Sequence, residues 1–330
     1  MSLSCRLALG ALAVAACHAP SAAPSAPVPS APAPVEVTTV AFTVTVNPER
    51  VLPALAWIPS TPTDRRLPVV ALSHGWGATK EHGAYLAQRI AAAGYVVVAV
   101  DHLNDSQATA FVRPLDVTAL LDLIADPARG PRELTARVDL ERVAVYGHSF
   151  GGLTALALGG ARVSPNPQWT AHCADGPALD CPAPPPGAFP TLAFADRRVD
   201  LVIAAAPAGY FQMGDDGVAA VTTPTLILAA GADTVTPLAT HVAPLAAHLQ
   251  PRHTLVTLTD ATHMTFADVC GAATPPDEVA AQCAGTGPLP IAAAHALIGE
   301  LVVAELDHTF ADGPALDAAA LAAAHAVAIQ

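Results

Sequence analysis

The stretch Val143-Ala144-Val145-Tyr146-Gly147-His148-Ser149-Phe150-Gly151-Gly152-Leu153-Thr154-Ala155-Leu156 decides the fold of this chain. An apolar run with strand character, Val143–Tyr146, leads directly into the hexapeptide 147–152, and an apolar run with helical character follows. The glycines two residues before and two residues after Ser149 permit a turn that is too sharp for bulkier residues. The sequence therefore predicts a strand, a tight turn with Ser149 at its tip, and a helix.

This G-x-S-x-G pattern between a strand and a helix is typical of the nucleophile elbow of α/β-hydrolases. We therefore predict an α/β fold with a mostly parallel central sheet, antiparallel N-terminal edge strands and helices on both faces. Pro53 interrupts the second strand, as an edge strand tolerates. The predicted strands are Val37–Val46, Val51–Ile58, Val69–Leu72, Tyr95–Val100, Val143–Tyr146, Val199–Ala206, Thr225–Ala230 and His253–Leu258. The predicted long helices between them are Lys80–Ala93, Pro114–Ala125, Pro237–Leu249 and Ile291–Leu306.

An acid and a histidine follow Ser149 in the order that this fold requires, each on the loop after a later strand. Asp233 follows the run Thr225–Ala230, and His263 follows the run His253–Leu258. A serine hydroxyl is a weak nucleophile at neutral pH, so an imidazole must accept its proton and a carboxylate must orient the imidazole. We expect Ser149, His263 and Asp233 to fill these roles.

The loop after Val69–Leu72 is expected to complete the site. Attack on an ester creates an oxyanion, which must meet preorganised N–H donors. We assign these donors to the backbone amides of Trp76, in Ser73-His74-Gly75-Trp76-Gly77, and of Phe150. We interpret His74 as a support for this loop rather than a catalytic group, and the Trp76 indole as a candidate floor of the acyl pocket.

The chain resembles the bacterial relatives of platelet-activating factor acetylhydrolase, often labelled dienelactone hydrolases, within the α/β-hydrolase superfamily. The resemblance extends from Pro68 to about Leu306, and it implies a serine esterase that needs no cofactor. The matching segments are Leu72-Ser73-His74-Gly75-Trp76-Gly77, Gly94-Tyr95-Val96-Val97-Val98-Ala99-Val100-Asp101-His102, Arg113-Pro114-Leu115-Asp116-Val117, Gly147-His148-Ser149-Phe150-Gly151-Gly152 and His263-Met264-Thr265-Phe266-Ala267-Asp268.

Two features depart from that family. Its acetylhydrolases carry the acid after the strand that follows the elbow helix, but here that strand ends in Ala204-Ala205-Ala206-Pro207. Asp233 must then serve, or Asp215 or Asp216 from the next loop. Dienelactone hydrolases themselves use a cysteine nucleophile, whereas this elbow holds Ser149, so the label does not indicate the substrate.

The first residues predict export. Residues 1–16 have a short segment with Arg6 and an apolar run of signal-peptide length. Val14-Ala15-Ala16-Cys17 resembles a bacterial lipobox, which predicts that Cys17 is lipidated and that the protein is a membrane-anchored lipoprotein. Ordinary cleavage after Ala16, or within the following tract, would give a secreted protein instead. Residues 17–35, rich in Ala, Pro and Ser, predict an extended spacer.

Cysteine usage is consistent with an oxidising compartment. Besides Cys5 and Cys17, the sequence contains Cys173, Cys181, Cys270 and Cys283. We favour the short-loop pairs Cys173–Cys181 and Cys270–Cys283, although four cysteines allow three connectivities. Because no C-x-x-C pair is present, these cysteines are not expected to hold a metal.

Residues 36–330 are long enough for one large domain, which we predict to be the catalytic domain and a monomer. The formal net charge of −13 makes nucleic acid and anionic membrane surfaces poor partners. Residues 163–198, rich in Pro and Cys, form an insertion that either arches over the site or covers a surface edge. We interpret Arg113 and Asp116 as a structural pair, and we find no catalytic partner for His102 in the required order.

The sequence thus predicts a carboxylic ester hydrolase that uses a serine nucleophile and acts on a small or lipid-like ester, with short acyl chains expected. Two alternatives remain open. An acyltransferase or amidase would use the same residues, and a non-catalytic binding lipoprotein would keep the fold without the reaction.

Overall fold

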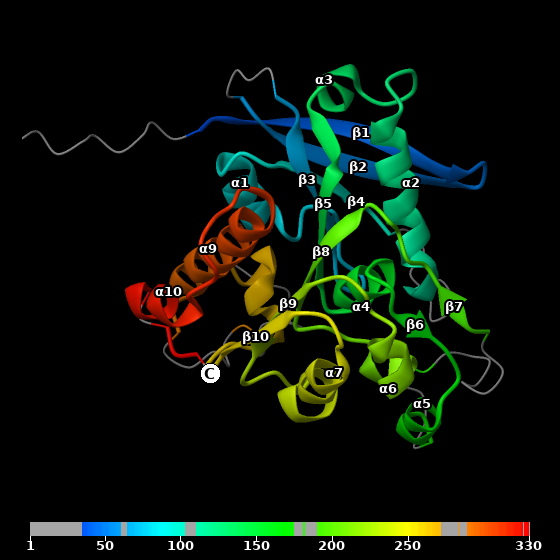
Figure 1. Cartoon of the computed structure of the whole chain (residues 1–330), viewed down its shortest axis with the longest axis vertical. Helices are drawn as coiled ribbons and strands as arrows, with labels where there is room; N and C mark the ends of the chain where they lie inside the picture. Colours follow the sequence, from blue (N-terminus) through cyan, green and yellow to red (C-terminus); the bar gives the residue numbers. More distant parts are fainter. Residues whose placement is uncertain are drawn as a thin grey trace, which may run out of the picture. The chain divides into compact units, whose positions relative to one another are not determined.

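An eight-stranded sheet in the order β1-β2-β4-β3-β5-β8-β9-β10 forms the centre of the molecule (Figure 1). The computed structural model describes residues 35–60, 65–102, 110–174, 181, 190–271, 283, 289–325 and 327–329. The predicted signal segment, Cys17 and nearly all of the predicted spacer lie outside these residues. The strands are β1 Val37–Asn47, β2 Arg50–Pro59, β3 Leu67–Ser73, β4 Val96–Val100, β5 Val138–His148, β8 Val199–Ala205, β9 Thr225–Ala230 and β10 His253–Leu258.

The directions of the strands confirm the α/β-hydrolase fold. The ladders β4–β3, β3–β5, β5–β8, β8–β9 and β9–β10 are all parallel. Strand β2 pairs antiparallel with β1 on one side and with β4 on the other. The prediction that the second strand lies at an edge is therefore wrong: of the two N-terminal strands, β1 lies at the edge of the sheet and β2 lies inside it. Pro53 lies at the end of the ladder with β4, where its carbonyl oxygen accepts the Asp101 N–H at 2.9 Å and its missing N–H ends the pairing.

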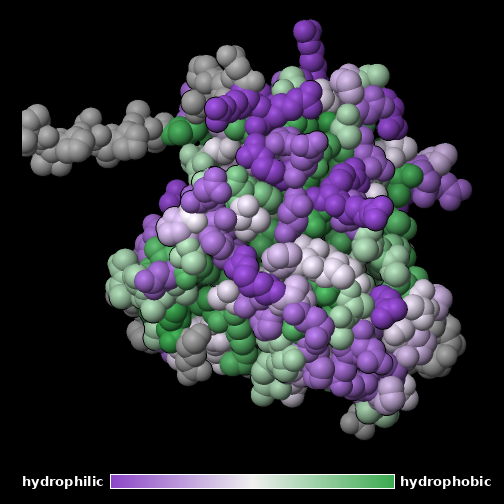
Figure 2. Space-filling model, in the orientation of Figure 1, coloured by the Kyte–Doolittle hydropathy of each residue, from purple (hydrophilic) through white to green (hydrophobic). Residues whose placement is uncertain are grey.

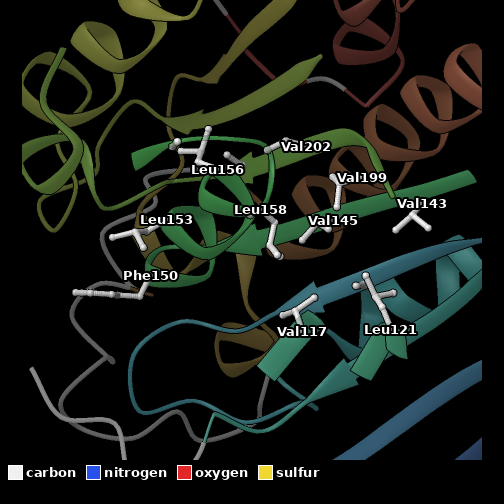
Figure 3. Packing of buried hydrophobic residues seen from close by; sticks show 14 of the residues in the cluster. Val117, Leu121, Val143, Val145, Phe150, Leu153, Leu156, Leu158, Val199 and Val202 are labelled. Carbon is white, nitrogen blue, oxygen red and sulfur yellow. The ribbon is translucent and has the colours of Figure 1, made fainter. Parts of the chain in front are cut away.

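Helices cover both faces of the sheet because the strand side chains alternate between two apolar cores. Along β3, for example, Val69 and Ala71 belong to one core, and Val70 and Leu72 belong to the other. The first core packs against α2 Arg113–Ala125, α4 Phe150–Leu158, α6 Tyr210–Ala219 and α7 Ala243–His248. Figure 3 shows the part of this core where α2 and α4 meet β5 and β8. The second core packs against α1 Ala84–Ala92, α9 Ile291–Phe310 and α10 Ala318–Ala324 (Figure 1).

Shorter elements connect these layers. They are η1 Ala110–Val112, α3 Arg132–Thr135, β6 Arg162–Val163, α5 Pro167–His172, β7 Leu192–Ala193, η3 Leu238–Val242, η4 His263–Phe266 and η5 Asp268–Gly271. The predicted helix Pro237–Leu249 is therefore divided between η3, a π-helical segment, and α7.

The predicted insertion, residues 163–198, is anchored to the domain at several points. Strands β6 and β7, near its two ends, pair antiparallel, and the disulfide Cys173–Cys181 confirms the first predicted pair. Trp169 is fully buried, and its ring makes a T-shaped contact with that of Phe111. Cys283 is disulfide-bonded, but the side chain of its predicted partner, Cys270, lies outside the described part of the chain.

Hydrophilic residues occupy much of the described surface on the face shown in Figure 2, with smaller apolar areas between them. Among the described residues, no helix is both long enough and apolar enough to cross a membrane.

The turn between β5 and α4 is built on close backbone approaches. A Cβ atom on Gly147 would lie 1.8 Å from the carbonyl oxygen of Gly151, and one on Gly151 would lie 1.9 Å from that of Ser73. Real Cβ atoms do not approach backbone this closely, so both positions require glycine. These contacts place the first turn of α4 directly against the carboxyl end of β3.

We predict that Gly151→Ala lowers the free energy of unfolding by about 1–3 kcal/mol, because the added methyl group must displace the backbone at Ser73. Gly83→Ala is the matched control, since its Cβ would meet only the Leu72 side chain at 3.7 Å. Urea unfolding of both variants measures the difference. Equal stability of the two variants would contradict this packing.

Candidate active site

Ser149 lies at the tip of this turn in a strained conformation. Its φ is +57° and its ψ is −118°, a region that non-glycine residues rarely adopt. Two hydrogen bonds hold the backbone of Ser149. Its N–H donates to the carbonyl oxygen of Ala205 at 2.9 Å, and its own carbonyl oxygen accepts the N–H of Ala208 at 3.0 Å. The carboxyl end of β8 therefore fixes the position from which the hydroxyl projects.

His263 and Asp233 meet at the same edge of the sheet. His263 Nδ1 lies 2.8 Å from Asp233 Oδ2. The other carboxylate oxygen, Oδ1, accepts the backbone N–H groups of Val235 at 2.7 Å and Thr236 at 2.8 Å. With Nδ1–H donated to Asp233, the neutral imidazole has its lone pair on Nε2. This is the tautomer that a general base requires.

The hydroxyl of Thr236 is a further contact of this pair, which the sequence did not indicate. It lies 2.9 Å from Asp233 Oδ2, 3.2 Å from His263 Nδ1 and 3.1 Å from the carbonyl oxygen of Ala206. Thr236 therefore links the loop after β9 to the end of β8. A threonine three residues after an acid is too common a pattern to reveal this role.

The Asp233 carboxylate is held in its charged form. Burial alone would raise the pKa of this carboxyl group, but the hydrogen bond and charge of His263 and the two backbone N–H groups lower the pKa below its usual value. Asp233 is therefore ionised at neutral pH and can stabilise positive charge on His263.

His148 supports the loop that carries His263. Its Nε2 donates to the His263 carbonyl oxygen at 2.9 Å, and the two rings lie 4.8 Å apart. Burial, followed by the neighbouring His263, lowers the pKa of His148 to about 3, so this imidazole stays neutral. The residue beside Ser149 thus contacts His263 directly.

Among the described residues, no hydrogen bond joins the Ser149 hydroxyl to the His263 ring. In hydrolases this contact often forms only when substrate is bound.

The segment expected to supply oxyanion donors lies against Ser149. A Cβ built on Gly75 would lie in ordinary van der Waals contact with the Ser149 Cβ, at 3.5 Å, which places the two backbones side by side. Phe150 is the first residue of α4, where a backbone N–H has no partner within the helix. The rings of Trp76 and Phe150 are in contact, with centroids 5.2 Å apart.

His74 has the supporting position that the sequence predicted for it. Its Nε2 accepts the His102 N–H at 3.0 Å, which leaves Nδ1 as the donor to the Gly75 carbonyl oxygen at 2.8 Å. Burial, followed by the nearby His102 and Arg113, lowers the pKa of His74 to about 2. The ring is therefore neutral and fixed in one tautomer.

A second array of Ser, His and Asp lies inside the protein beside this segment, and the sequence analysis missed it. Ser73 Oγ lies 2.9 Å from His102 Nε2, and His102 Nδ1 lies 2.8 Å from Asp116 Oδ2. Arg50 also binds Asp116 through two hydrogen bonds, at 2.7 and 2.6 Å. Despite burial, Arg50 and His102 lower the pKa of Asp116. The chain order here is Ser, His, Asp, so a search for Ser, acid, His does not find it.

Burial distinguishes the two arrays. Ser73 is 1% exposed and the His102 side chain 0%, whereas Ser149 is 7% exposed and the His263 side chain 6%. Ser73 also belongs to regular strand β3, where its carbonyl group faces Gly151. An acyl group on Ser73 would have to displace the core, while one on Ser149 would lie at the edge of the sheet. The inner array therefore suits a structural role.

Within the described residues, no group of His, Cys, Asp or Glu side chains is arranged to hold a metal ion. Asp215, an alternative acid, accepts a hydrogen bond from the Tyr210 hydroxyl at 2.7 Å.

Comparisons with known proteins add independent observations. The family model for PET hydrolase-like proteins matches residues 24–172, a little under half of the chain. Cutinase 1 of Thermobifida cellulosilytica is 31% identical over 180 residues, which cover 53% of this chain and 51% of that protein. A cutinase of Thermobifida fusca is 31% identical over 180 residues, covering 53% of this chain and 44% of that protein. The chain spans about half the length of the curated relatives it matches.

We predict that acid destabilises this site through its buried neutral histidines. A histidine whose pKa is lowered on folding binds its proton more readily in the unfolded chain, so its contribution is present above the ordinary value of 6.5 and is lost as the pH falls towards the folded value, about 3 for His148. Each such histidine should contribute a slope of about 1.4 kcal/mol per pH unit in this window.

Substituting His148→Gln, which keeps an N–H donor, should reduce this slope by about 1.4 kcal/mol per pH unit. Denaturant unfolding at several values between about pH 7 and pH 4 measures the slope of the unfolding free energy against pH. His253→Gln is the matched control, because His253 is exposed. An unchanged slope in His148→Gln would show that burial does not keep this ring neutral.

Proposed function

We propose, on the premise of the α/β-hydrolase fold, that this chain is a serine carboxylic ester hydrolase with Ser149 as nucleophile, His263 as general base and acid, and Asp233 as the group that orients His263. The observation that carries the proposal is the His263–Asp233 hydrogen bond of 2.8 Å beside a serine held at a φ of +57°. The similarity to cutinases and to the PET hydrolase-like family supports the same chemistry.

The first half of the proposed reaction forms an acyl-enzyme. Ser149 Oγ attacks the carbonyl carbon of the ester while its proton passes to His263 Nε2, and the ionised Asp233 stabilises the imidazolium that results. The negative charge on the former carbonyl oxygen is received by the N–H groups of Trp76 and Phe150. The C–O bond to the alcohol then breaks, and His263 returns the proton to the leaving oxygen.

The second half releases the acid. Water attacks the acyl carbon, gives its proton to His263 Nε2, and forms a second oxyanion at the same donors. The bond to Ser149 Oγ breaks, and the serine recovers its proton from His263. No cofactor enters either step. Transfer to an alcohol or amine would differ only in the acceptor that replaces water.

The substrate that we propose is an uncharged carboxylic ester with a short acyl chain, because the net charge of −13 disfavours anionic ligands. The matched relatives are named as cutinases and PET hydrolase-like proteins, so polyesters belong in a substrate panel. The narrower resemblance to platelet-activating factor acetylhydrolase relatives stays a prediction, and phospholipid esters test it.

We also propose that the protein is exported. The disulfide Cys173–Cys181 supports this location, since disulfides persist in oxidising compartments. Lipidation of Cys17 and anchoring to a membrane remain predictions, as does the monomeric state.

We predict that Ser149→Ala lowers kcat for p-nitrophenyl acetate or butyrate about a thousandfold or more, because the proposed reaction forms the acyl-enzyme on Ser149. Ser73→Ala, which removes the serine of the inner array, is the matched control and should keep kcat within about tenfold of the parent. Steady-state kinetics of the three proteins measure this difference. A large loss of kcat in Ser73→Ala, with kcat retained in Ser149→Ala, would show that Ser73 is the nucleophile and that Ser149 is not.

A further inference from the structure

We infer that Arg113 is a positioning residue for the oxyanion donors, holding the peptide that carries the Trp76 N–H in the orientation the reaction needs. The inference rests on the proposed function and gives a role to a residue that the sequence analysis interpreted only as half of a structural pair. In the structure, Asp116 is engaged by Arg50 and His102, whereas Arg113 reaches the segment beside Ser149.

Arg113 is fully buried and donates to two successive carbonyl groups of this segment. Its Nη1 lies 2.8 Å from the carbonyl oxygen of His74, and its Nη2 lies 3.3 Å from that of Gly75. A guanidinium suits this task, because its planar fork presents several N–H donors in fixed directions. A single ammonium group could not match both carbonyl oxygens with the same geometry.

The peptide between Gly75 and Trp76 transmits this contact to the proposed donor. In a trans peptide, the carbonyl group and the following N–H point in opposite directions. The Gly75 carbonyl oxygen accepts His74 Nδ1 at 2.8 Å, Arg113 Nη2 at 3.3 Å and the Ala78 N–H at 3.4 Å. Fixing this oxygen on the side of Arg113 directs the Trp76 N–H away from Arg113.

Arg113 also contacts the residue that carries the second donor. Its guanidinium carbon lies 5.9 Å from the centre of the Phe150 ring, and this ring packs against the Trp76 indole at 5.2 Å. One cation thus contacts the Phe150 ring and the carbonyl group next to the Trp76 N–H. A displacement of the guanidinium would disturb both proposed donors together.

Helix α2 holds Arg113 in place. Arg113 begins this helix and Asp116 lies one turn later, where Arg50 from β2 and His102 from the end of β4 bind it. Because His102 also contacts Ser73 at 2.9 Å, the inner array fixes the start of α2 against the carboxyl ends of β3 and β4. The inner array thereby serves the active site without taking part in the reaction.

The test compares Arg113→Lys and Arg113→Met with the parent. We expect kcat for a p-nitrophenyl ester to fall about 10–100-fold with little change in KM, because a misplaced donor weakens the transition state more than substrate binding. The matched control is Arg137→Lys. Arg137 also donates from Nη2 to a backbone carbonyl, that of Pro59 at 2.9 Å, but it lies just before β5, at the opposite end of that strand from Ser149. This control should keep kcat near the parent value.

A thionoester of the same acid and alcohol separates positioning from a general loss of structure. Sulfur accepts hydrogen bonds weakly, so its hydrolysis gains less from the Trp76 and Phe150 N–H groups. The ratio of kcat/KM for the oxygen ester to that for the thionoester should therefore fall in the Arg113 variants and stay constant in Arg137→Lys. Near-UV circular dichroism shows which variants keep the native packing.

Each outcome decides the inference. A reduced kcat and a reduced oxygen-to-sulfur ratio in a folded Arg113 variant support it. A folded variant with the parent's ratio overturns it, and so does failure of both variants to fold, since Arg113 would then serve the fold alone. If the parent itself cleaves neither ester, the proposed function fails and this inference falls with it.

Discussion

The candidate site depends on the close approach of the first turn of α4 to the ends of β3 and β5. Gly147 and Gly151 permit it, since a Cβ on either would come within 2 Å of a backbone oxygen. This approach forces Ser149 into a positive φ and sets its hydroxyl at the edge of the sheet. Parallel strands β8, β9 and β10 end at that same edge, so their loops deliver Asp233 and His263 to it.

Two sets of serine, histidine and aspartate lie close together here, and their surroundings separate their roles. The inner set is sealed in the core, and its Asp116 is neutralised by Arg50, so it works as a rigid brace between strands and helix. In the outer set, Ser149 and His263 are slightly exposed, and Ser149 precedes the first backbone N–H groups of α4. Residue types alone do not make a nucleophile: access and a place for the developing negative charge are needed as well.

The sequence was sufficient for the fold class and for most strands, because alternating apolar runs and the glycines around Ser149 constrain the chain locally. It also predicted that Asp233 follows the strand β9 and that His263 follows β10, and the structure joins these two side chains by a hydrogen bond. It did not predict that the strand with Pro53 lies inside the sheet, nor the contacts of Thr236 and Arg113. It also did not predict the inner array. Those features depend on which strands become neighbours and on contacts between residues far apart in the chain. The sheet order, with β4 between β2 and β3, is not visible in local patterns.

We propose that Ser149 is the nucleophile, although the Ser73 hydroxyl contacts His102 at 2.9 Å and no hydrogen bond joins the Ser149 hydroxyl to His263 in the described part of the chain. The most direct measurement is reaction of the parent protein with a fluorophosphonate, followed by mass spectrometry of its peptides. We predict a single adduct on the peptide that contains Ser149, with none on the peptide that contains Ser73. An adduct on Ser73, or no adduct in a protein that hydrolyses esters, would contradict it.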